Sequence, residues 1–228
     1  MEKLEKLMPA ERLKFYFRYG IVKARMYVCT CAGICWCVRH GKEVVQSMVF
    51  VNEEFDSASG IIVCGYYKPY GKWRNDPETA DAPYDLYSGK ILDLKEGKSG
   101  AVNYFYSLLD DEICPGVAIA VVPSHSPENK GGGLKALAKK LAAHDRIDMT
   151  ECLIRTKEIE KLSRGGNRDK GVHLDSIAVN PDVPVADEVV LMVDDVTTSG
   201  TSLYACRDIL LAHGAKRVAL LALGQTTR

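Results

Sequence analysis

Residues 189–201 combine an apolar run, two adjacent carboxylates and a loop of hydroxyl side chains and glycine. The apolar run is 189–193, the carboxylates are Asp194 and Asp195, and an amphipathic segment follows at 203–213. This order predicts a buried strand of a parallel sheet, a tight anion-binding turn, and a helix whose N-terminus points at the turn. Ligands of open α/β sheets bind outside the carboxyl ends of the strands, where this turn would lie.

The residue types in this stretch suit a phosphorylated sugar. A helix N-terminus offers N–H groups and a partial positive charge to an anion, and Gly200 allows close backbone approach. Four hydroxyl donors belong to the same loop: Thr197, Thr198, Ser199 and Thr201. Because Asp194 and Asp195 would repel a phosphate, we expect them to bind sugar hydroxyls or to face a divalent cation. The alternative, a hydroxyl that merely caps the helix, explains one such side chain but not four beside a carboxylate pair.

The stretch resembles the phosphoribosyl pyrophosphate (PRPP) motif of type I phosphoribosyltransferases, which consists of an apolar strand, an acidic pair and a Thr/Ser/Gly loop. The resemblance implies the α/β fold of that family, with a central, mainly parallel sheet flanked by helices. It also implies that the loop from Thr197 to Thr201 binds the ribose 5-phosphate and that Asp194 and Asp195 contact the ribose hydroxyls. PRPP with Mg²⁺ is the ligand that follows from it.

A second loop follows a predicted strand at 117–122. In the resembled family the corresponding loop meets the pyrophosphate of the donor, and Ser124, His125 and Lys130 lie in that place, before glycines at 131–133. Hydroxyls, backbone N–H groups and a positive charge suit such a ligand. Pro, Ser and Gly are equally expected in a solvent-exposed connection, and a surface position is the more common outcome for His125.

A polar, basic segment at 155–173 is the third feature. Related enzymes have a mobile loop here that closes over the diphosphate, which implies catalytic roles for Arg164 and then Arg168. The planar fork of arginine can bind two diphosphate oxygens at once. The alternative is a solvated basic loop without a specific role.

Four of the eight cysteines form a cluster: Cys29, Cys31, Cys35 and Cys37. Two short strands around 32–34 would form a hairpin with all four sulfurs on one face. Such a cluster could bind structural Zn²⁺, with His40 nearby, although zinc sites favour two to four residues between paired cysteines. The alternative is a half-buried strand pair that uses cysteine as a small apolar residue.

Hydrophobic periodicity predicts the remaining elements. Helical character is expected at 2–19, 101–109, 134–144 and 203–213, a β-meander at 27–51, a long surface loop at 68–89, and strands at 61–67, 117–122, 152–155, 177–179, 189–193 and 217–223. We expect an N-terminal helical and Cys-rich β subdomain at 1–60 and a phosphoribosyltransferase-like domain at 61–228.

Composition narrows the class of protein. Lys plus Arg and Asp plus Glu number 30 each, so no global charge attracts nucleic acid, and direct nucleic-acid binding is not expected. No apolar run is long enough to span a membrane, and the charged N-terminus lacks the apolar centre of a signal peptide, which predicts a cytoplasmic protein. Cytosolic thiols are usually reduced, so a disulfide framework is not expected.

Within the family, the chain looks most like the ComF-like, competence-associated branch. The resemblance covers roughly 61–223 and implies transfer of ribose 5-phosphate from PRPP to a base-like acceptor with release of pyrophosphate. A homodimer is one assembly that it allows. Five residues follow the last predicted strand, so the base pocket of purine-salvage members is expected to be curtailed. The competing prediction is a non-catalytic PRPP- or nucleotide-binding protein with a regulatory or DNA-uptake role, since a fold does not determine a function.

Overall fold

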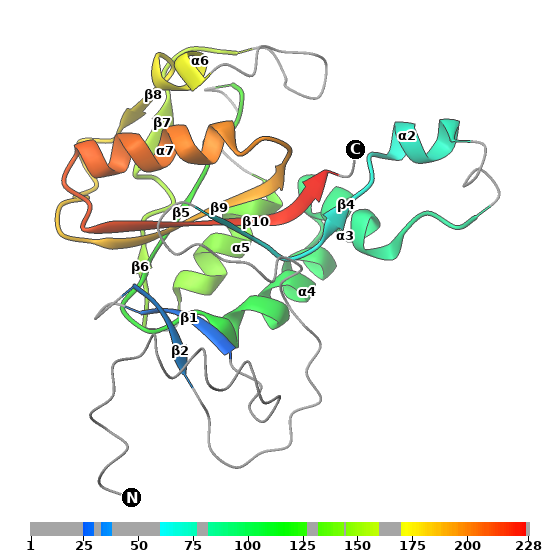
Figure 1. The fold of residues 1–228 in the computed structure, drawn as a ribbon, viewed down its shortest axis with the longest axis horizontal. Helices are drawn as coiled ribbons and strands as arrows, with labels where there is room; N and C mark the ends of the chain where they lie inside the picture. Colours follow the sequence, from blue (N-terminus) through cyan, green and yellow to red (C-terminus); the bar gives the residue numbers. More distant parts are fainter. Residues whose placement is uncertain are drawn as a thin grey trace, which may run out of the picture.

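The computed structural model describes residues 25–29, 33–37, 60–76, 82–126, 132–143, 145–159 and 170–226. At its centre is a six-stranded sheet in the order β3-β10-β9-β5-β6, with β4 also paired to β10, and every pairing is parallel (Figure 1). Its strands are β3 (Ile61–Val63), β4 (Tyr66–Tyr67), β5 (Ala118–Val121), β6 (Ile147–Asp148), β9 (Val189–Thr197) and β10 (Arg217–Thr226). The protein is therefore an α/β protein with a mainly parallel central sheet flanked by helices, as the sequence predicts.

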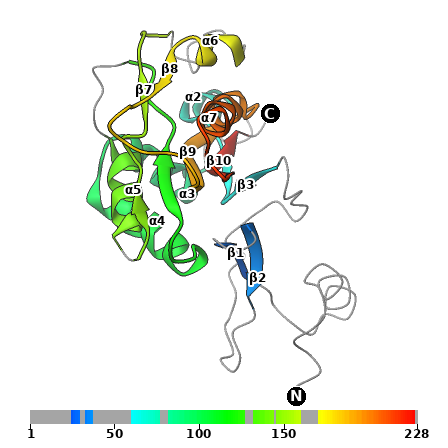
Figure 2. The ribbon, with the colours of Figure 1, turned by 90° about the vertical axis from the view of Figure 1, so that its left-hand side faces the viewer.

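Helices cover both faces of this sheet. On one face lie α3 (Leu86–Lys95), α4 (Ser99–Leu109) and α5 (Gly133–Ala142), and on the other lies α7 (Thr201–Ala212) (Figures 1 and 2). Successive residues of β9 alternate between two cores: Leu191 and Val193 pack with α3–α5, whereas Met192 packs with α7. This double burial explains why the strand is apolar without interruption.

The predicted strand at 61–67 is confirmed as two short strands, β3 and β4, which pair with β10 in the same register. Ile61 lies opposite Leu220 and Tyr66 lies opposite Gln225, so β3 and β4 keep the same offset along β10. Cys64 and Gly65 separate the two strands, although the Cys64 N–H still donates to the Ala222 carbonyl at 3.0 Å and the Gly65 carbonyl accepts the Gln225 N–H at 2.9 Å. There, a Cβ on Gly65 would come within 2.4 Å of the Tyr87 ring, so close packing against α3 requires glycine.

The predicted loop at 68–89 is wrong in part. It contains α2 (Tyr70–Asn75) and the start of α3, whose first turn is capped by Asp85, since its carboxylate accepts the Ser88 N–H at 2.7 Å. Tyr70, Trp73 and Tyr84 pack together with ring centroids 5.2–5.4 Å apart. The segment is rich in turn residues, but the cap and this aromatic cluster organise it.

Two further strands form a separate antiparallel ribbon. They are β7 (Leu153–Arg155) and β8 (Ile177–Val179), which confirm the predicted strands at 152–155 and 177–179. The short helix α6 (Lys170–Leu174) precedes β8 and packs beside α7 (Figure 2). Together they place a small layer outside α7, and α6 contacts that helix at both Ser202 and Asp208.

The cysteine hairpin is confirmed, with a shifted turn. Its strands are β1 (Arg25–Cys29) and β2 (Gly33–Cys37), so Gly33 and Ile34, which are expected near the turn, belong to the second strand. The register places Cys29, Cys35 and Cys37 at positions that share one face of the hairpin, as expected, whereas Cys31 lies outside the described residues. The predicted helix at 2–19 and most of the predicted β-meander lie outside the described residues. Within the described ranges, no helix is long and apolar enough to cross a membrane.

Candidate functional site

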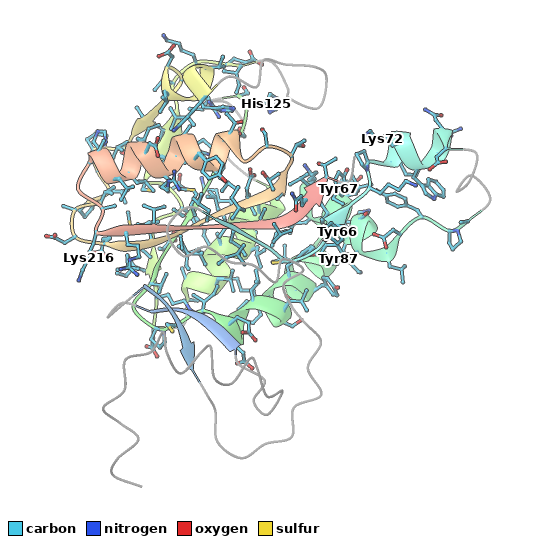
Figure 3. The ribbon with its side chains drawn as sticks, viewed as in Figure 1. Tyr66, Tyr67, Lys72, Tyr87, His125 and Lys216 are labelled. Carbon is cyan, nitrogen blue, oxygen red and sulfur yellow. The ribbon has the colours of Figure 1, made fainter. Side chains whose placement is uncertain are left out.

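The predicted sugar-phosphate motif lies where the parallel strands end. The carboxyl ends of β4, β5, β9 and β10 share one edge of the sheet, because these strands run in the same direction. In Figure 3, Tyr67 lies near the arrowhead end of β10, whereas Lys216, which precedes β10, lies at the opposite edge. This edge brings together the segment after β9, the segment after β5 and the end of α3.

Asp194 and Asp195 lie inside β9 rather than in the turn after it. Pairing with β10 continues past them, with Asp194 opposite Ala222 and Thr197 opposite Gln225. The predicted strand ends at 193 and at 223 are therefore too early. Charged and glycine residues interrupt the apolar pattern, but the backbone ladder does not depend on side-chain polarity.

The two carboxylates have different surroundings. Asp195 forms an ion pair with Lys95 at the end of α3, with 3.0 Å between Oδ1 and Nζ. The Asp195 N–H donates to Oδ1 of Asp194 at 2.9 Å. Burial, and then the negative charge of Asp195, raise the pKa of Asp194 to about 7. Adjacent strand residues point to opposite faces, so the pair presents one carboxylate on each side of the sheet edge.

The turn after β9 has the geometry of an anion-binding loop. Gly200 adopts a left-handed conformation, with φ of +78°, and α7 begins at the next residue. A Cβ on Gly200 would lie 2.4 Å from Cδ1 of Ile61, so only glycine fits this turn without displacement. The first N–H groups of α7 have no carbonyl partner within the helix and face the turn.

The hydroxyl side chains of this turn do not cap the helix. The N-cap residue of α7 is Gly200, which has no side chain, so the capping interpretation of these hydroxyls fails. Thr198 and Ser199 are exposed, and Thr197 is buried. Two hydroxyl pairs lie within hydrogen-bonding distance: Thr198 with Thr226 at 3.0 Å, and Ser199 with Thr201 at 2.8 Å.

The loop after β5 lies at the same edge. Ser124 donates its hydroxyl to the Ser126 carbonyl at 2.7 Å, and the His125 carbonyl accepts the Ile159 N–H at 3.0 Å. Lys130, Arg164, Arg168 and Cys31 lie outside the described residues, and Cys29, Cys35 and Cys37 are described only in their backbone. Among the described residues, no group of three or more His, Cys, Asp or Glu side chains is placed to hold a metal ion.

Sequence reasoning assigned no site role to three residues of this region, of which Lys95 is exposed and Arg155 and His173 are buried. Lys95 reaches Asp195 from α3; Arg155 donates to the loop after β5; and Nε2 of His173 lies 3.2 Å from the Ser202 hydroxyl in the first turn of α7. Burial lowers the pKa of His173, and the neighbouring Arg155 charge lowers it further. Arg155 gives a signal in the sequence, since it directly follows the apolar run of β7, but its contacts require the tertiary structure.

No family model matches the chain, and no curated protein matches it. Among solved structures, the chain is similar to a hypoxanthine phosphoribosyltransferase from Staphylococcus aureus, with 12% identity, coverage of 61% of this chain and 74% of that one, and a TM-score of 0.34. A purine phosphoribosyltransferase from Pyrococcus horikoshii has 19% identity and a TM-score of 0.31, and the match covers 61% of this chain and 73% of that one. A phosphoribosylpyrophosphate synthetase from Mycobacterium smegmatis has 17% identity and a TM-score of 0.30. The match covers 55% of this chain and 31% of that one, about a third of the enzyme. These identities and TM-scores are too low to assign the chain to a family.

Proposed function

We propose that this protein binds PRPP and transfers its ribose 5-phosphate to a base-like acceptor, releasing pyrophosphate, as type I phosphoribosyltransferases do. One observation carries the proposal: the acidic pair of β9, the left-handed Gly200 turn into α7 and the loop after β5 share the carboxyl edge of one parallel sheet. The ligand that suits this combination has a phosphate, vicinal hydroxyls and a second anionic group. PRPP has all three.

In this proposal the turn at Thr198, Ser199 and Gly200 holds the 5-phosphate with the first N–H groups of α7. Asp194 and Asp195 bind the ribose hydroxyls from the two sides of the sheet edge. Asp194 also suits a Mg²⁺ ion that arrives with the diphosphate, because Mg²⁺ takes one or two carboxylates together with phosphate oxygens and water. The metal then belongs to the substrate and neutralises the charge of the leaving group.

Transfer requires that the bond between the anomeric carbon and the diphosphate breaks while the acceptor approaches. Positive charge develops on the sugar and negative charge on the departing diphosphate, so positioning and electrostatics supply most of the catalysis. Ser124 and His125 would meet the diphosphate. The roles of Lys130, Arg164 and Arg168 in covering it stay predictions.

The second candidate is a PRPP- or nucleotide-binding protein without transferase activity, with a regulatory or DNA-uptake role in the manner of the ComF-like branch. The ion pair between Lys95 and Asp195 favours it, because one carboxylate of the pair already has a cationic partner within the chain. A site that only binds the sugar does not have to stabilise the charges that develop during a transfer reaction.

Titration calorimetry with PRPP and Mg²⁺ tests the shared part of both functions. We expect binding by the wild-type protein and a loss of roughly tenfold or more in affinity for Asp194→Asn and Asp195→Asn. Asp182→Asn is the matched control, since this carboxylate is exposed and belongs to the connection between β8 and β9, outside the candidate site. No binding at millimolar PRPP, or unchanged affinity in both edge variants, would refute the assignment.

Pyrophosphate release separates the two candidates. The wild-type protein is incubated with PRPP, Mg²⁺ and each member of a panel of purine and pyrimidine bases. Release that depends on one base identifies a transferase and its acceptor, whereas binding without base-dependent release supports the sensor.

A further inference from the structure

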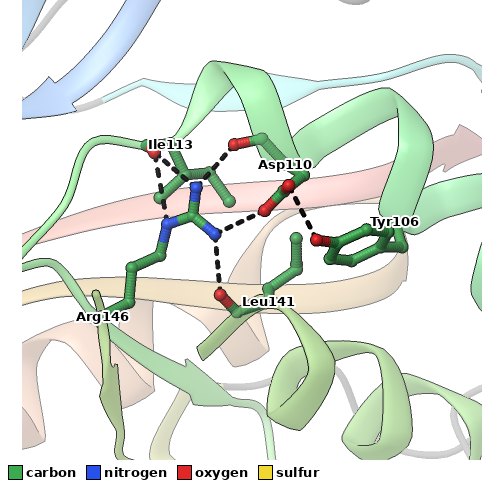
Figure 4. Close-up of polar contacts among 5 residues, drawn as sticks. All are labelled: Tyr106, Asp110, Ile113, Leu141 and Arg146. Carbon is green, nitrogen blue, oxygen red and sulfur yellow. Dashed lines mark hydrogen bonds and ion pairs between the residues drawn. The ribbon is translucent and has the colours of Figure 1, made fainter. Parts of the chain in front are cut away.

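Within the part of the chain that the structure describes, the side chains of Arg146 and Arg155 are buried and donate to backbone carbonyls, but only Arg146 forms an ion pair with a carboxylate. The side chain of Arg146 is 6% exposed and forms an ion pair with Asp110 at 2.7 Å, besides donating to the carbonyls of Asp110, Ile113 and Leu141 (Figure 4). Arg146 precedes β6, so it lies at the amino edge of the sheet, away from the candidate site. Its charge is compensated inside the protein.

Arg155 lies at the end of β7 and is 7% exposed. It donates through Nε to the Ser124 carbonyl at 2.8 Å, through Nη2 to the Pro123 carbonyl at 3.2 Å, and through Nη1 to the Ser176 hydroxyl at 2.6 Å. Among the residues that the structure describes, no carboxylate forms an ion pair with it. A buried charge without a counter-charge is costly, so this position favours an anion nearby.

The two carbonyl contacts determine how the loop after β5 is oriented. In a trans peptide the N–H and the C=O point in opposite directions, and the described residues contain no cis peptide bond. Because the carbonyls of Pro123 and Ser124 point at Arg155, the N–H groups of Ser124 and His125 point away from it. Two successive N–H groups on one side of a loop form an anion-binding concavity.

The guanidinium also connects this loop, through Ser176 and α6, to the first turn of α7. The Ser176 hydroxyl that accepts from Arg155 donates in turn to the Val172 carbonyl of α6 at 2.5 Å. The next residue of α6, His173, lies 3.2 Å from the Ser202 hydroxyl through Nε2. A partly buried series of polar contacts therefore runs from the loop after β5, through Arg155 and α6, to the first turn of α7.

We infer that Arg155 is a positioning residue for the diphosphate: it turns the Pro123 and Ser124 carbonyls inward, so that the Ser124 and His125 N–H groups face the ligand, and its charge compensates the anion from behind the loop. The inference rests on the proposed function, because it assumes that this loop meets the diphosphate of PRPP. Arg155 acts through the loop and does not touch the ligand.

Matched variants test the inference. Arg155→Lys and Arg146→Lys each keep the charge but lose the fork that binds two carbonyls at once. PRPP with Mg²⁺, inorganic pyrophosphate with Mg²⁺, and ribose 5-phosphate are titrated separately into each folded protein. For Arg155→Lys we expect roughly tenfold weaker binding of PRPP and pyrophosphate and unchanged binding of ribose 5-phosphate. For Arg146→Lys we expect a lower melting temperature and unchanged affinity for all three.

Other outcomes would refute the proposed function, the role of Arg155, or both. If the wild-type protein binds neither PRPP nor pyrophosphate, the proposed function fails and the role of Arg155 fails with it. If the wild-type protein binds PRPP and Arg155→Lys binds it equally well, only the inference is refuted. If Arg155→Lys weakens all three ligands to the same extent, its role is structural and the inference is likewise refuted. Ser176→Ala, which leaves both loop contacts in place, should behave like the wild-type protein with all three ligands.

Discussion

Asp194 and Asp195 are adjacent in the chain, yet the folded protein gives them different chemistry. Asp195 has a lysine 3.0 Å away, while Asp194 is half-buried beside another carboxylate and accepts one backbone N–H. A carboxylate that is hard to ionise gains most from a cation or from hydroxyl donors. At the scale of single residues, Asp194 is therefore the carboxylate of the pair that gains more from a bound cation or from ligand hydroxyls.

The pH dependence of stability should reveal Asp194. Its pKa rises from 3.8 to about 7 in the folded protein, so between these values the folded state holds a proton that the unfolded chain has released. Stability contributed by this group is then full below about 4 and is lost as pH rises through about 7. Asp194→Asn should be more stable than the wild-type protein above about 7, by up to about 4 kcal/mol, since one pKa unit is roughly 1.4 kcal/mol.

Urea unfolding over a pH series measures this effect. Asp182→Asn should keep the wild-type profile, because its carboxylate is exposed. An Asp194→Asn profile parallel to that of the wild-type protein would contradict the assigned burial.

Gly200 supports a second prediction at the residue scale. Gly200→Ala places a Cβ 2.4 Å from Ile61 and 2.7 Å from Tyr204 in a left-handed backbone. We expect a loss of about 1–3 kcal/mol in the free energy of unfolding and weaker binding of phosphate ligands, measured by urea unfolding and calorimetry. Gly71→Ala is the control, since nothing lies within 4 Å of its Cβ; equal stability of the two variants would count against the tight turn.

At the scale of elements, the close approach of α3 and α5 determines the position of Lys95. A Cβ on Gly133, the first residue of α5, would meet the Leu94 carbonyl at 2.0 Å. Leu94 precedes Lys95, whose amine reaches Asp195. The start of one helix thus supports the end of another, and that end supplies the cation at the sheet edge.

Gly133→Ala should therefore separate α3 from α5. We expect a loss of about 1–3 kcal/mol in stability, because the clash is with backbone and not with a flexible side chain. Gly100→Ala in α4 has open space around its Cβ and should be neutral or stabilising by up to about 1 kcal/mol. Chemical denaturation distinguishes the two, and a neutral Gly133→Ala would show that the helices can move apart freely.

At the scale of the whole molecule, one sheet separates two cores. Phe105 of α4 is fully buried on one face, and Leu203 of α7 is fully buried on the other. Both cores contact the same central strands, so the two layers should unfold together. The carboxyl edge is then held from both sides, which gives the site a rigid base.

Phe105→Ala and Leu203→Ala test this cooperativity. Each should cost about 2–5 kcal/mol, and the double variant should lose their sum within about 0.5 kcal/mol, since the side chains are separated by the sheet. Circular dichroism and tryptophan fluorescence should report one transition during urea unfolding. Two separate transitions would indicate that the faces unfold independently.

The sequence alone determined the strand, turn and helix of the sugar-phosphate motif, because an uninterrupted apolar run, a left-handed glycine and an amphipathic period are local features of residues 189–213. It also determined most other strands of the α/β sheet for the same reason. It did not predict α2, α3, or the continuation of β9 through Asp194 and Asp195, since these depend on the Asp85 cap, an aromatic cluster and the length of β10. Only the tertiary structure brought Lys95 to Asp195 and Arg155 to the carbonyls of Pro123 and Ser124. Such contacts join residues about 30 to 100 positions apart, and no local pattern encodes a distance that arises from packing helices and strands around a common sheet.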